Sequence, residues 1–221
     1  MFNTADLKYR HDNFNVQVEA FQKRIDNIWT SVFDFTYEEN PYQYVNSNIK
    51  GIELSWSYDH PSFFVQNTFN WTQDILEFED ASTTRSPFYQ PFRSGIYFSY
   101  KLKNFTLSTS WNYATGRFFS LPSEFIIENQ TDGSKAYLIE YDEIQTEQTT
   151  DYHRLDASLS YQFQVKKANF KTGINAFNLY NNDNVLSSQY YTDYREDPII
   201  PTLYTRKGLP LIVDIFVQVG F

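Results

Sequence analysis

Hydrophobic and polar residues alternate along most of this chain with a period of two. The last segment shows this most clearly, because every odd-numbered residue from Leu209 to Phe221 is apolar whereas Asp214 and Gln218 lie between them. Successive side chains of a β-strand point to opposite faces, so the pattern predicts strands with one apolar and one polar face. The same alternation recurs in earlier runs, including residues 51–58, 105–114 and 154–163. It predicts an all-β antiparallel fold of about nine strands without helices.

The connections between these strands alternate between short and long. The short ones lie at residues 11–13, 60–62, 103–104 and 165–169, and the long ones at about 33–44, 76–92, 116–150 and 181–208. All long connections therefore fall at one end of the sheet, the long-loop end, and all short ones at the other, the short-turn end. Many runs are about ten residues long, which is the length of a tilted strand that crosses a bilayer. This combination is typical of transmembrane β-barrels of the outer-membrane type.

Aromatic rings gather near both ends of the expected strands. Trp56 and Tyr58 lie near the short-turn end, and Trp111 and Tyr113 near the long-loop end. Aromatic residues make up 19% of the 221 residues, yet the mean hydropathy is only −0.54. Amphipathic rings favour the headgroup region of a membrane. Two aromatic belts and a polar interior would account for both values, whereas a soluble β-sandwich would use the rings as its core.

Composition excludes several other classes of protein. No stretch of about 18 apolar residues is present, so a transmembrane helix is excluded. The first residues, MFNTADLKYRHDN, show no secretory signal. The chain has no Cys, which rules out disulfides and thiolate metal sites. A net charge of −9 argues against nucleic acid as a partner.

Five segments resemble the C-terminal barrel portion of TonB-dependent outer-membrane receptors, in particular those of Bacteroidetes-like bacteria. They are NIKGIELSWSY at 48–58, WNYATGRFFSLPS at 111–123, DYHRLDASLSYQF at 151–163, INAFNLYNNDNV at 174–185, and the terminal strand that ends in Phe221. In this terminal strand Val217, Val219 and Phe221 resemble the signal that the barrel assembly machinery reads. The resemblance implies a location in the bacterial outer membrane and a sector of a 22-stranded barrel whose lumen holds a plug domain.

The resemblance also sets expectations for domain organisation. We expect residues 1–221 to form a single barrel segment, because no plug and no TonB-contacting motif is recognisable in them. With nine strands the first and last would run parallel and leave open edges, which are costly in lipid. The chain would then be a truncated receptor or a subunit of a split one. With eight or ten strands it could instead be a complete small barrel, acting as a passive pore or adhesin. A soluble carbohydrate-binding β-sandwich is a third reading.

The function that the resemblance implies is nutrient uptake. Substrates of this family are iron chelates, haem, cobalamin, glycans or peptides. The implied partners are outer-membrane lipid, the remaining N-terminal barrel and plug in the same or a separate chain, TonB through the plug only, and a surface lipoprotein. We expect no nucleic acid partner and no cofactor.

Catalytic and metal-binding patterns are missing from the sequence. It contains no P-loop, nucleophile elbow, H-E-x-x-H or dinucleotide glycine pattern, so we expect no enzyme. His153 lies close to Asp151 and Asp156, but the family pattern explains it without catalysis. The acidic connection 116–150 lacks the order of a Ca²⁺-binding loop; a solvated loop is the default interpretation, and Ca²⁺ binding through its oxygen ligands is the alternative.

Three groups of candidate residues follow. In the long connections, Tyr and Arg combine stacking surfaces with hydrogen-bond donors and suit ligand capture. These candidates are Arg117, Phe118, Tyr190, Tyr191, Tyr194, Arg195, Tyr204 and Arg206. On the polar face, candidates for contact with the lumen or plug are Glu53, Lys101, Asp156, Lys171, Asn175, Asp214 and Gln218. The assembly-signal candidates are Val217, Val219 and Phe221.

Overall fold

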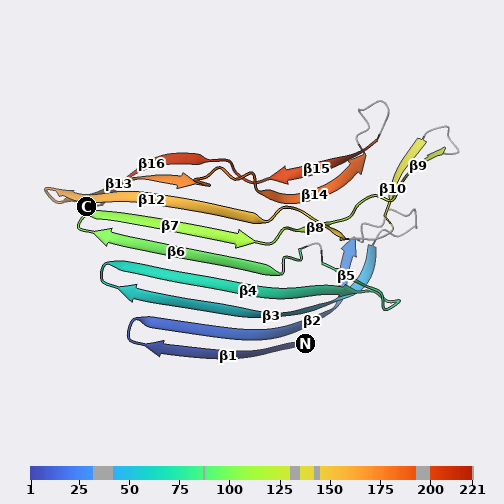
Figure 1. Cartoon of the computed structure of the whole chain (residues 1–221), viewed down its shortest axis with the longest axis horizontal. Coiled ribbons are helices and arrows are strands. Elements are labelled where there is room, and N and C mark those ends of the chain that lie inside the picture. Colours follow the sequence, from blue (N-terminus) through green and yellow to red (C-terminus); the bar gives the residue numbers. More distant parts are fainter. Residues whose placement is uncertain (32–41, 87, 130–134, 142–144, 193–199, 221) are drawn as a thin grey trace.

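One antiparallel sheet makes up most of the molecule (Figure 1). The computed structural model describes residues 1–31, 42–86, 88–129, 135–141, 145–192 and 200–220. Nine strands pair in chain order: β1 (Phe2–His11), β2 (Phe14–Ser31), β3 (Tyr42–His60), β4 (Phe63–Glu77), β6 (Phe92–Leu102), β7 (Phe105–Ala114), β12 (Tyr152–Val165), β13 (Ala168–Phe177) and β16 (Ile212–Gly220). This confirms the all-β antiparallel prediction. Within the described ranges, no helix is long and apolar enough to cross a membrane.

Two-residue turns join the strands at the short-turn end. They consist of residues 12–13, 61–62, 103–104 and 166–167. Asp12, Lys103 and Lys166 adopt positive φ angles of 49°, 53° and 54°. Tight hairpins favour this backbone conformation because it matches the right-handed twist of the two strands. The short connections therefore lie where the sequence predicts them.

The long connections contain strands that the sequence pattern does not predict. Strand β5 (Thr83–Arg85) pairs with β4, β8 (Phe118–Phe119) with β11 (Glu147–Gln148), β9 (Glu124–Asn129) with β10 (Lys135–Glu140), and β14 (Val185–Thr192) with β15 (Pro201–Lys207). Strands β5, β8 and β11 have only two or three residues, and the longer ones, such as β14 (VLSSQYYT), do not alternate strictly between apolar and polar residues. Strands β2 and β3 are 18 and 19 residues long and stay paired beyond a bulge between Ile25 and Ile28.

The strand register carries one apolar face across the whole sheet. Directly opposed residues of an antiparallel pair share a face. One such row crosses the sheet through Leu155, Trp111, Ile96, Asn67, Trp56, Val16 and Tyr9. Asn67 is the polar exception in this row, and its Nδ2 donates a hydrogen bond to the Gly95 carbonyl oxygen at 3.1 Å. The opposite face is lined mainly by polar side chains.

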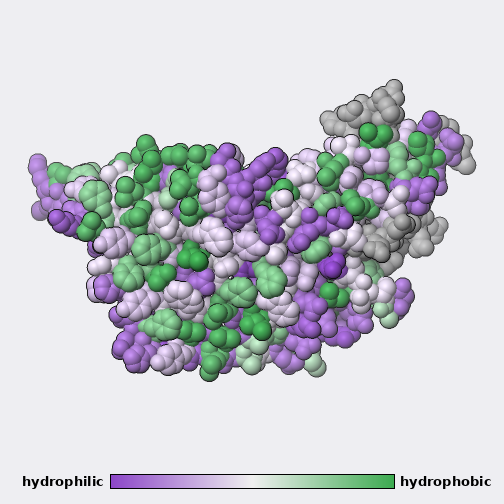
Figure 2. Space-filling model, viewed as in Figure 1, coloured by the Kyte–Doolittle hydropathy of each residue, from purple (hydrophilic) through white to green (hydrophobic). Residues whose placement is uncertain are grey.

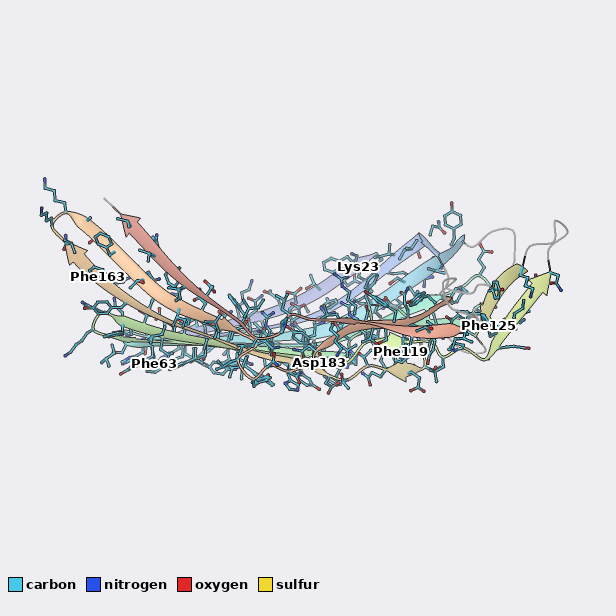
Figure 3. The ribbon with its side chains drawn as sticks, turned by 90° about the horizontal axis from the view of Figure 1, so that it is seen from above. Lys23, Phe63, Phe119, Phe125, Phe163 and Asp183 are labelled. Carbon is cyan, nitrogen blue, oxygen red and sulfur yellow. The ribbon has the colours of Figure 1, made fainter. Side chains whose placement is uncertain are left out.

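The sheet has almost no conventional core. Among the described residues, the buried hydrophobic side chains are Val45 and Ile139 alone. By contrast, Leu7, Ile215 and Val217 on the apolar face are 71%, 77% and 67% exposed. Figure 2 shows hydrophobic side chains gathered over the strands, and Figure 3 shows that the sheet is bowed, with Phe63 on its convex side. No second sheet covers the apolar face in the described part of the chain, so the arrangement is not a β-sandwich.

Glycine residues on the polar face allow rings to lie flat across the strands. A Cβ added to Gly51 would lie 2.7 Å from the ring of Phe21, which is directly opposite on β2. A Cβ added to Gly173 would lie 2.7 Å from the ring of Phe216, its partner on β16. Each ring therefore covers a glycine on the neighbouring strand, an arrangement that fixes the register of the pair.

Candidate functional site

Two groups of ring contacts lie on the apolar face. Near the short turns, ring centroids are 4.8 Å apart in His60–Phe63, 4.6 Å in Phe105–Tyr161 and 5.1 Å in Phe163–Phe170. Near the long-loop end, Trp111 and Tyr113 stack at 6.0 Å, and Phe69 and Phe92 lie 6.3 Å apart. The apolar strip between them is thus bounded by aromatic rings at both ends, as in a protein that spans a bilayer with strands.

The polar face carries every lumen candidate predicted from the sequence. Ser158 donates a hydrogen bond to Asn175 at 2.7 Å, and Asn175 donates to Asp214 at 3.1 Å, so a polar chain crosses β12, β13 and β16. Lys171 lies opposite Gln218 on the same two strands. Glu53 and Lys101 are exposed. Contact of this face with a lumen or plug stays a prediction.

Three carboxylates form a row on the same face. Asp6 lies directly opposite Glu19, and Glu19 lies directly opposite Glu53. Lys8 pairs with Asp6 at 2.8 Å and interacts electrostatically with Glu19, which also accepts a hydrogen bond from Thr4 at 2.9 Å, whereas Glu53 has no ion pair with a described residue. Like charges directly opposite in a sheet are unfavourable. The row therefore favours a positively charged partner against this part of the wall.

The hairpin of β14 and β15 separates the loop candidates into two faces. Tyr191 and Tyr204 are in edge contact at 5.9 Å, and Arg206 shares their face by register. Tyr190 lies on the other face, near Tyr141. Burial, together with this neighbour, raises the pKa of Tyr141 above its ordinary value. Tyr194 and Arg195 lie outside the described residues.

The remaining loop candidates belong to another strand pair. The ring centroids of Phe118 and Tyr89 lie 5.6 Å apart, and the guanidinium of Arg85 lies 4.6 Å from the centre of the Phe118 ring. The backbone N–H of Arg117 donates to Thr149 Oγ1 at 2.9 Å. Arg85 was not among the sequence candidates, because it lies in a three-residue strand with no periodicity.

An asparagine cluster lies at the long-loop ends of β12 and β13, and the sequence pattern does not predict it. Asn178 is fully buried with a φ of 53°. Its backbone N–H donates to Asp156 at 2.9 Å, and its side chain donates to the carbonyls of Asn182 and Leu209 at 2.9 and 3.0 Å. Asn178 thus joins the start of the β13–β16 connection to its end. The run NLYNNDN is the signal, but its role depends on contacts distant in sequence.

The same cluster forms hydrogen bonds with His153. Its backbone N–H donates to Asn184 Oδ1 at 2.8 Å, and its Nδ1 lies 2.9 Å from the Tyr180 hydroxyl. Asp156, one of the lumen candidates, instead pairs with Arg154 at 2.8 Å and receives the Asn178 N–H. No group of three or more His, Cys, Asp or Glu side chains that could hold a metal occurs in the part of the chain that the structure describes.

Comparison with known proteins identifies the family. The family model described as "TonB dependent receptor-like, beta-barrel" matches residues 4–179. The chain belongs to the TonB-dependent receptor family. Its fold resembles the ferripyoverdine receptor of the outer membrane of Pseudomonas aeruginosa bound to ferripyoverdine, with a TM-score of 0.59 and 14% identity over 99% of this chain. It also resembles the FpvAI–pyocin S2 complex, with a TM-score of 0.57, 15% identity and 99% of this chain covered.

The chain spans 27% of the length of each of these two solved chains. No curated protein sequence is significantly similar to it. Membership of the family confirms the predicted outer-membrane location and the receptor-barrel type of the fold. In such barrels the short turns are periplasmic and the long loops extracellular. The finer resemblance to receptors of Bacteroidetes-like bacteria stays a prediction.

Proposed function

We propose that residues 1–221 form one sector of the wall of a nutrient-uptake receptor, with its apolar face against lipid and its polar face toward the lumen. The observation that carries this proposal is the continuous register. It keeps one face apolar and exposed across nine strands and places aromatic rings at both ends of that face. Lipid is the partner that such an exposed face fits.

The strand directions specify what must complete the barrel. Nine antiparallel strands make β1 and β16 run in the same direction, toward the short-turn end. These two edges cannot pair antiparallel with each other, nor can the β16 of one copy pair antiparallel with the β1 of another. The rest of the wall must therefore supply an odd number of strands. We infer that a different part of the receptor, in the same or a separate chain, supplies them.

We infer that a plug fills the lumen beside this wall and that TonB acts through the plug. The row of Asp6, Glu19 and Glu53 supports a positively charged plug surface at this position. Asp214 and Gln218 on the edge strand β16 would extend the polar face onto the neighbouring sector. No reaction at this wall is needed for transport, because the energy would arrive through the plug.

We infer that the long loops capture the nutrient outside the cell. The face formed by Tyr191, Tyr204 and Arg206 supports this role, because rings supply stacking area and Arg supplies donors. An iron chelate, haem, cobalamin, a glycan or a peptide all fit this chemistry, and a surface lipoprotein would share the same side. The similar receptor is bound to ferripyoverdine, so a ferric chelate is the first probe to use.

Single cysteines test the proposed orientation, because the chain contains no native Cys. Leu159→Cys and Gln162→Cys place a thiol on the apolar and polar faces of β12. With an environment-sensitive fluorophore attached, the receptor in proteoliposomes should be quenched by spin-labelled lipid at position 159 and not at position 162. Equal quenching at both positions would contradict the proposal.

A further inference from the structure

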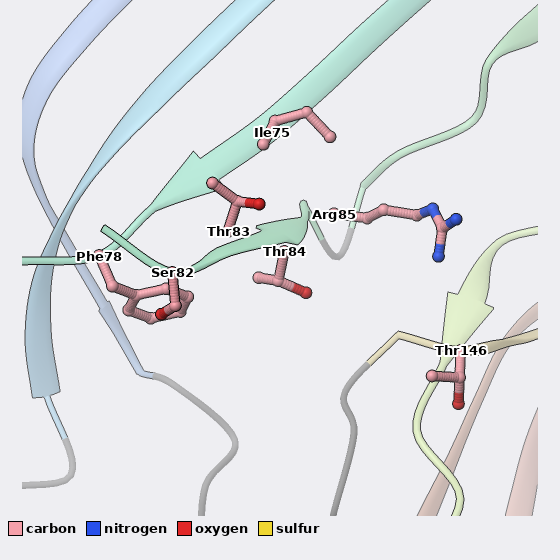
Figure 4. Close-up of a pocket in the computed structure, with 7 residues that line it drawn as sticks. All are labelled: Ile75, Phe78, Ser82, Thr83, Thr84, Arg85 and Thr146. Carbon is pink, nitrogen blue, oxygen red and sulfur yellow. The ribbon is translucent and has the colours of Figure 1, made fainter. Parts of the chain in front are cut away.

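A cleft of about 480 Å³ opens at the extracellular end between β5 and Thr146, which precedes β11 (Figure 4). Its volume is within the range of small-molecule sites, about 300–1,000 Å³. It is lined by Ile75, Phe78, Ser82, Thr83, Thr84, Arg85 and Thr146. None of the described loop residues that the sequence predicts for ligand capture lines it.

The β4–β5 turn builds one wall of the cleft. The Phe78 N–H donates to the Ser82 carbonyl at 3.0 Å, and Ala81 takes a φ of 65°. Asp80 accepts hydrogen bonds from both the backbone N–H and the hydroxyl of Ser82, at 2.9 and 2.6 Å. These bonds lower the pKa of Asp80. The Ser82 hydroxyl therefore donates its hydrogen bond to Asp80 and can only accept hydrogen bonds from a ligand.

Arg85 is held in a fixed orientation beside the cleft. Its guanidinium lies 4.6 Å from the Phe118 ring centre, and its Nη1 donates to the Gln145 carbonyl at 3.1 Å. A guanidinium has five N–H donors in one plane, so most of them remain available. Among the described residues that line the cleft, Arg85 is the one with a charged side chain.

Threonines from two segments contribute to the polar lining: Thr83 and Thr84 are consecutive in β5 and project to opposite sides of that strand, and Thr146 lies across the cleft (Figure 4). Thr83, Thr84 and Thr146 make no side-chain hydrogen bond to any other described residue. Each hydroxyl can donate one hydrogen bond and accept two. Ile75 and Phe78 add an apolar surface beside them (Figure 4). The cleft thus combines free hydroxyls, planar donors and a small apolar wall.

We propose that this cleft binds a saccharide unit. Sugars present alternating hydroxyl groups, which match the threonines and Arg85, and a C–H face, which matches Ile75 and Phe78. The carboxylates of Glu77 and Asp80 lie at the margin of the cleft and would repel a multiply charged anion. Glu77 lies directly opposite Thr83, and Asp80 accepts a hydrogen bond from Ser82. The proposal deepens the proposed function and rests on it for the outward orientation of this end.

The sugar has two chemical sources, which the experiment separates. One is a soluble oligosaccharide, and the other is the sugar headgroup of the lipopolysaccharide that surrounds the receptor. Vesicles carrying the receptor are titrated with maltotriose and cellotriose, which carry no charge, and the detergent-solubilised receptor is titrated with purified lipopolysaccharide. Binding of any trisaccharide supports a soluble ligand, and binding of lipopolysaccharide alone supports the headgroup.

Isosteric variants show whether the cleft is the site. Thr84→Val and Thr146→Val each remove one hydroxyl and should weaken binding about two- to tenfold. Arg85→Met should weaken it at least as much, but it also releases Gln145, so the threonine variants decide. Thr106→Val, in β7 near the short turns, is the matched control and should bind as the wild type does.

The proposal is overturned if no probe binds, or if both threonine variants bind like the wild type. Lipid quenching at Leu159→Cys is independent of the cleft. A failure of sugar binding with normal quenching would therefore remove this inference alone, whereas a failure of quenching would remove the proposed orientation on which it rests.

Discussion

Individual residues in this chain act according to the face on which they lie. Tyr190 and Tyr191 are neighbours in sequence, but only Tyr191 contacts Tyr204, and Tyr190 lies on the opposite face near Tyr141. Gly173 and Gly220 differ in the same way, because Phe216 covers the first and nothing lies near the second. The role of a residue type therefore depends on its register position.

Tyr191→Ala tests the loop face that captures the nutrient. Loss of a stacking ring should weaken capture about tenfold, because such contacts contribute on the order of 1 kcal/mol or more. Uptake of radiolabelled ferric chelates by whole cells measures the effect. Phe88→Ala, at an exposed ring of the same end, is the control and should leave uptake unchanged. Normal uptake by Tyr191→Ala would remove this face from the ligand path.

Gly173→Ala tests the covered glycine. The new Cβ would lie 2.6 Å from the Leu159 carbonyl oxygen and 2.7 Å from the Phe216 ring, so we expect a loss of about 1–3 kcal/mol. Urea titration of the assembled receptor, followed by heat-modifiable gel mobility, measures it. Gly220→Ala has nothing within 4 Å and should be neutral. Equal midpoints for the two variants would contradict the packing described here.

At the scale of elements, the sheet and the loops are stabilised by different interactions. The long strands depend on ladder hydrogen bonds and on a face that suits lipid. The β14–β15 hairpin instead depends on the asparagine cluster at its base, where Asn178 and Asn181 bond Leu209 and Leu211. An ion pair between Lys207 and Asp183 adds a further contact there.

Asn178→Ala should loosen the β14–β15 hairpin without preventing barrel assembly. The substitution removes side-chain bonds to Asn182 and Leu209 and places Ala at a positive φ, which is unfavourable for it. Limited proteolysis of intact cells should cut the 178–211 connection several times faster. Asn129→Ala, at the exposed end of β9, should show the wild-type rate. An unchanged cleavage rate would mean that the cluster does not hold the hairpin.

The whole molecule is an open sheet whose two faces need different surroundings. Its apolar face has almost no covering side chains, and both its edges run in the same direction. A water-soluble domain of this size would bury a core, so the exposed apolar face and open edges support the proposal that lipid covers one face and further strands continue the sheet.

Ile215→Arg tests the lipid-facing side of the whole barrel. Ile215 is 77% exposed on the apolar face, and an arginine there should cost about 2–4 kcal/mol near the middle of the bilayer. The yield of heat-modifiable receptor in the outer membrane should fall. Gln218→Arg, on the polar face of the same strand, should assemble at the wild-type level. Equal yields would show that the two faces are assigned wrongly.

The sequence by itself determined the fold class, the positions of the short turns and the orientation of the faces, because a period of two is a local property. It also placed Val217 and Val219 on the apolar face, while Phe221 lies outside the described residues. It could not find the strands inside the long connections, because they are either two or three residues long or lack strict alternation of apolar and polar residues.

Only the tertiary structure decided which residues meet. It brings Arg85 into contact with Phe118 and Gln145, and Asn178 into contact with Leu209. These residues are far apart in sequence, so no local pattern predicts the contacts. It also places Tyr190 and Tyr191, both candidates for ligand capture, on opposite faces of the hairpin. The physical reason is that the alternation of faces is set by each strand alone, whereas a site depends on the register between strands and on the path of the loops.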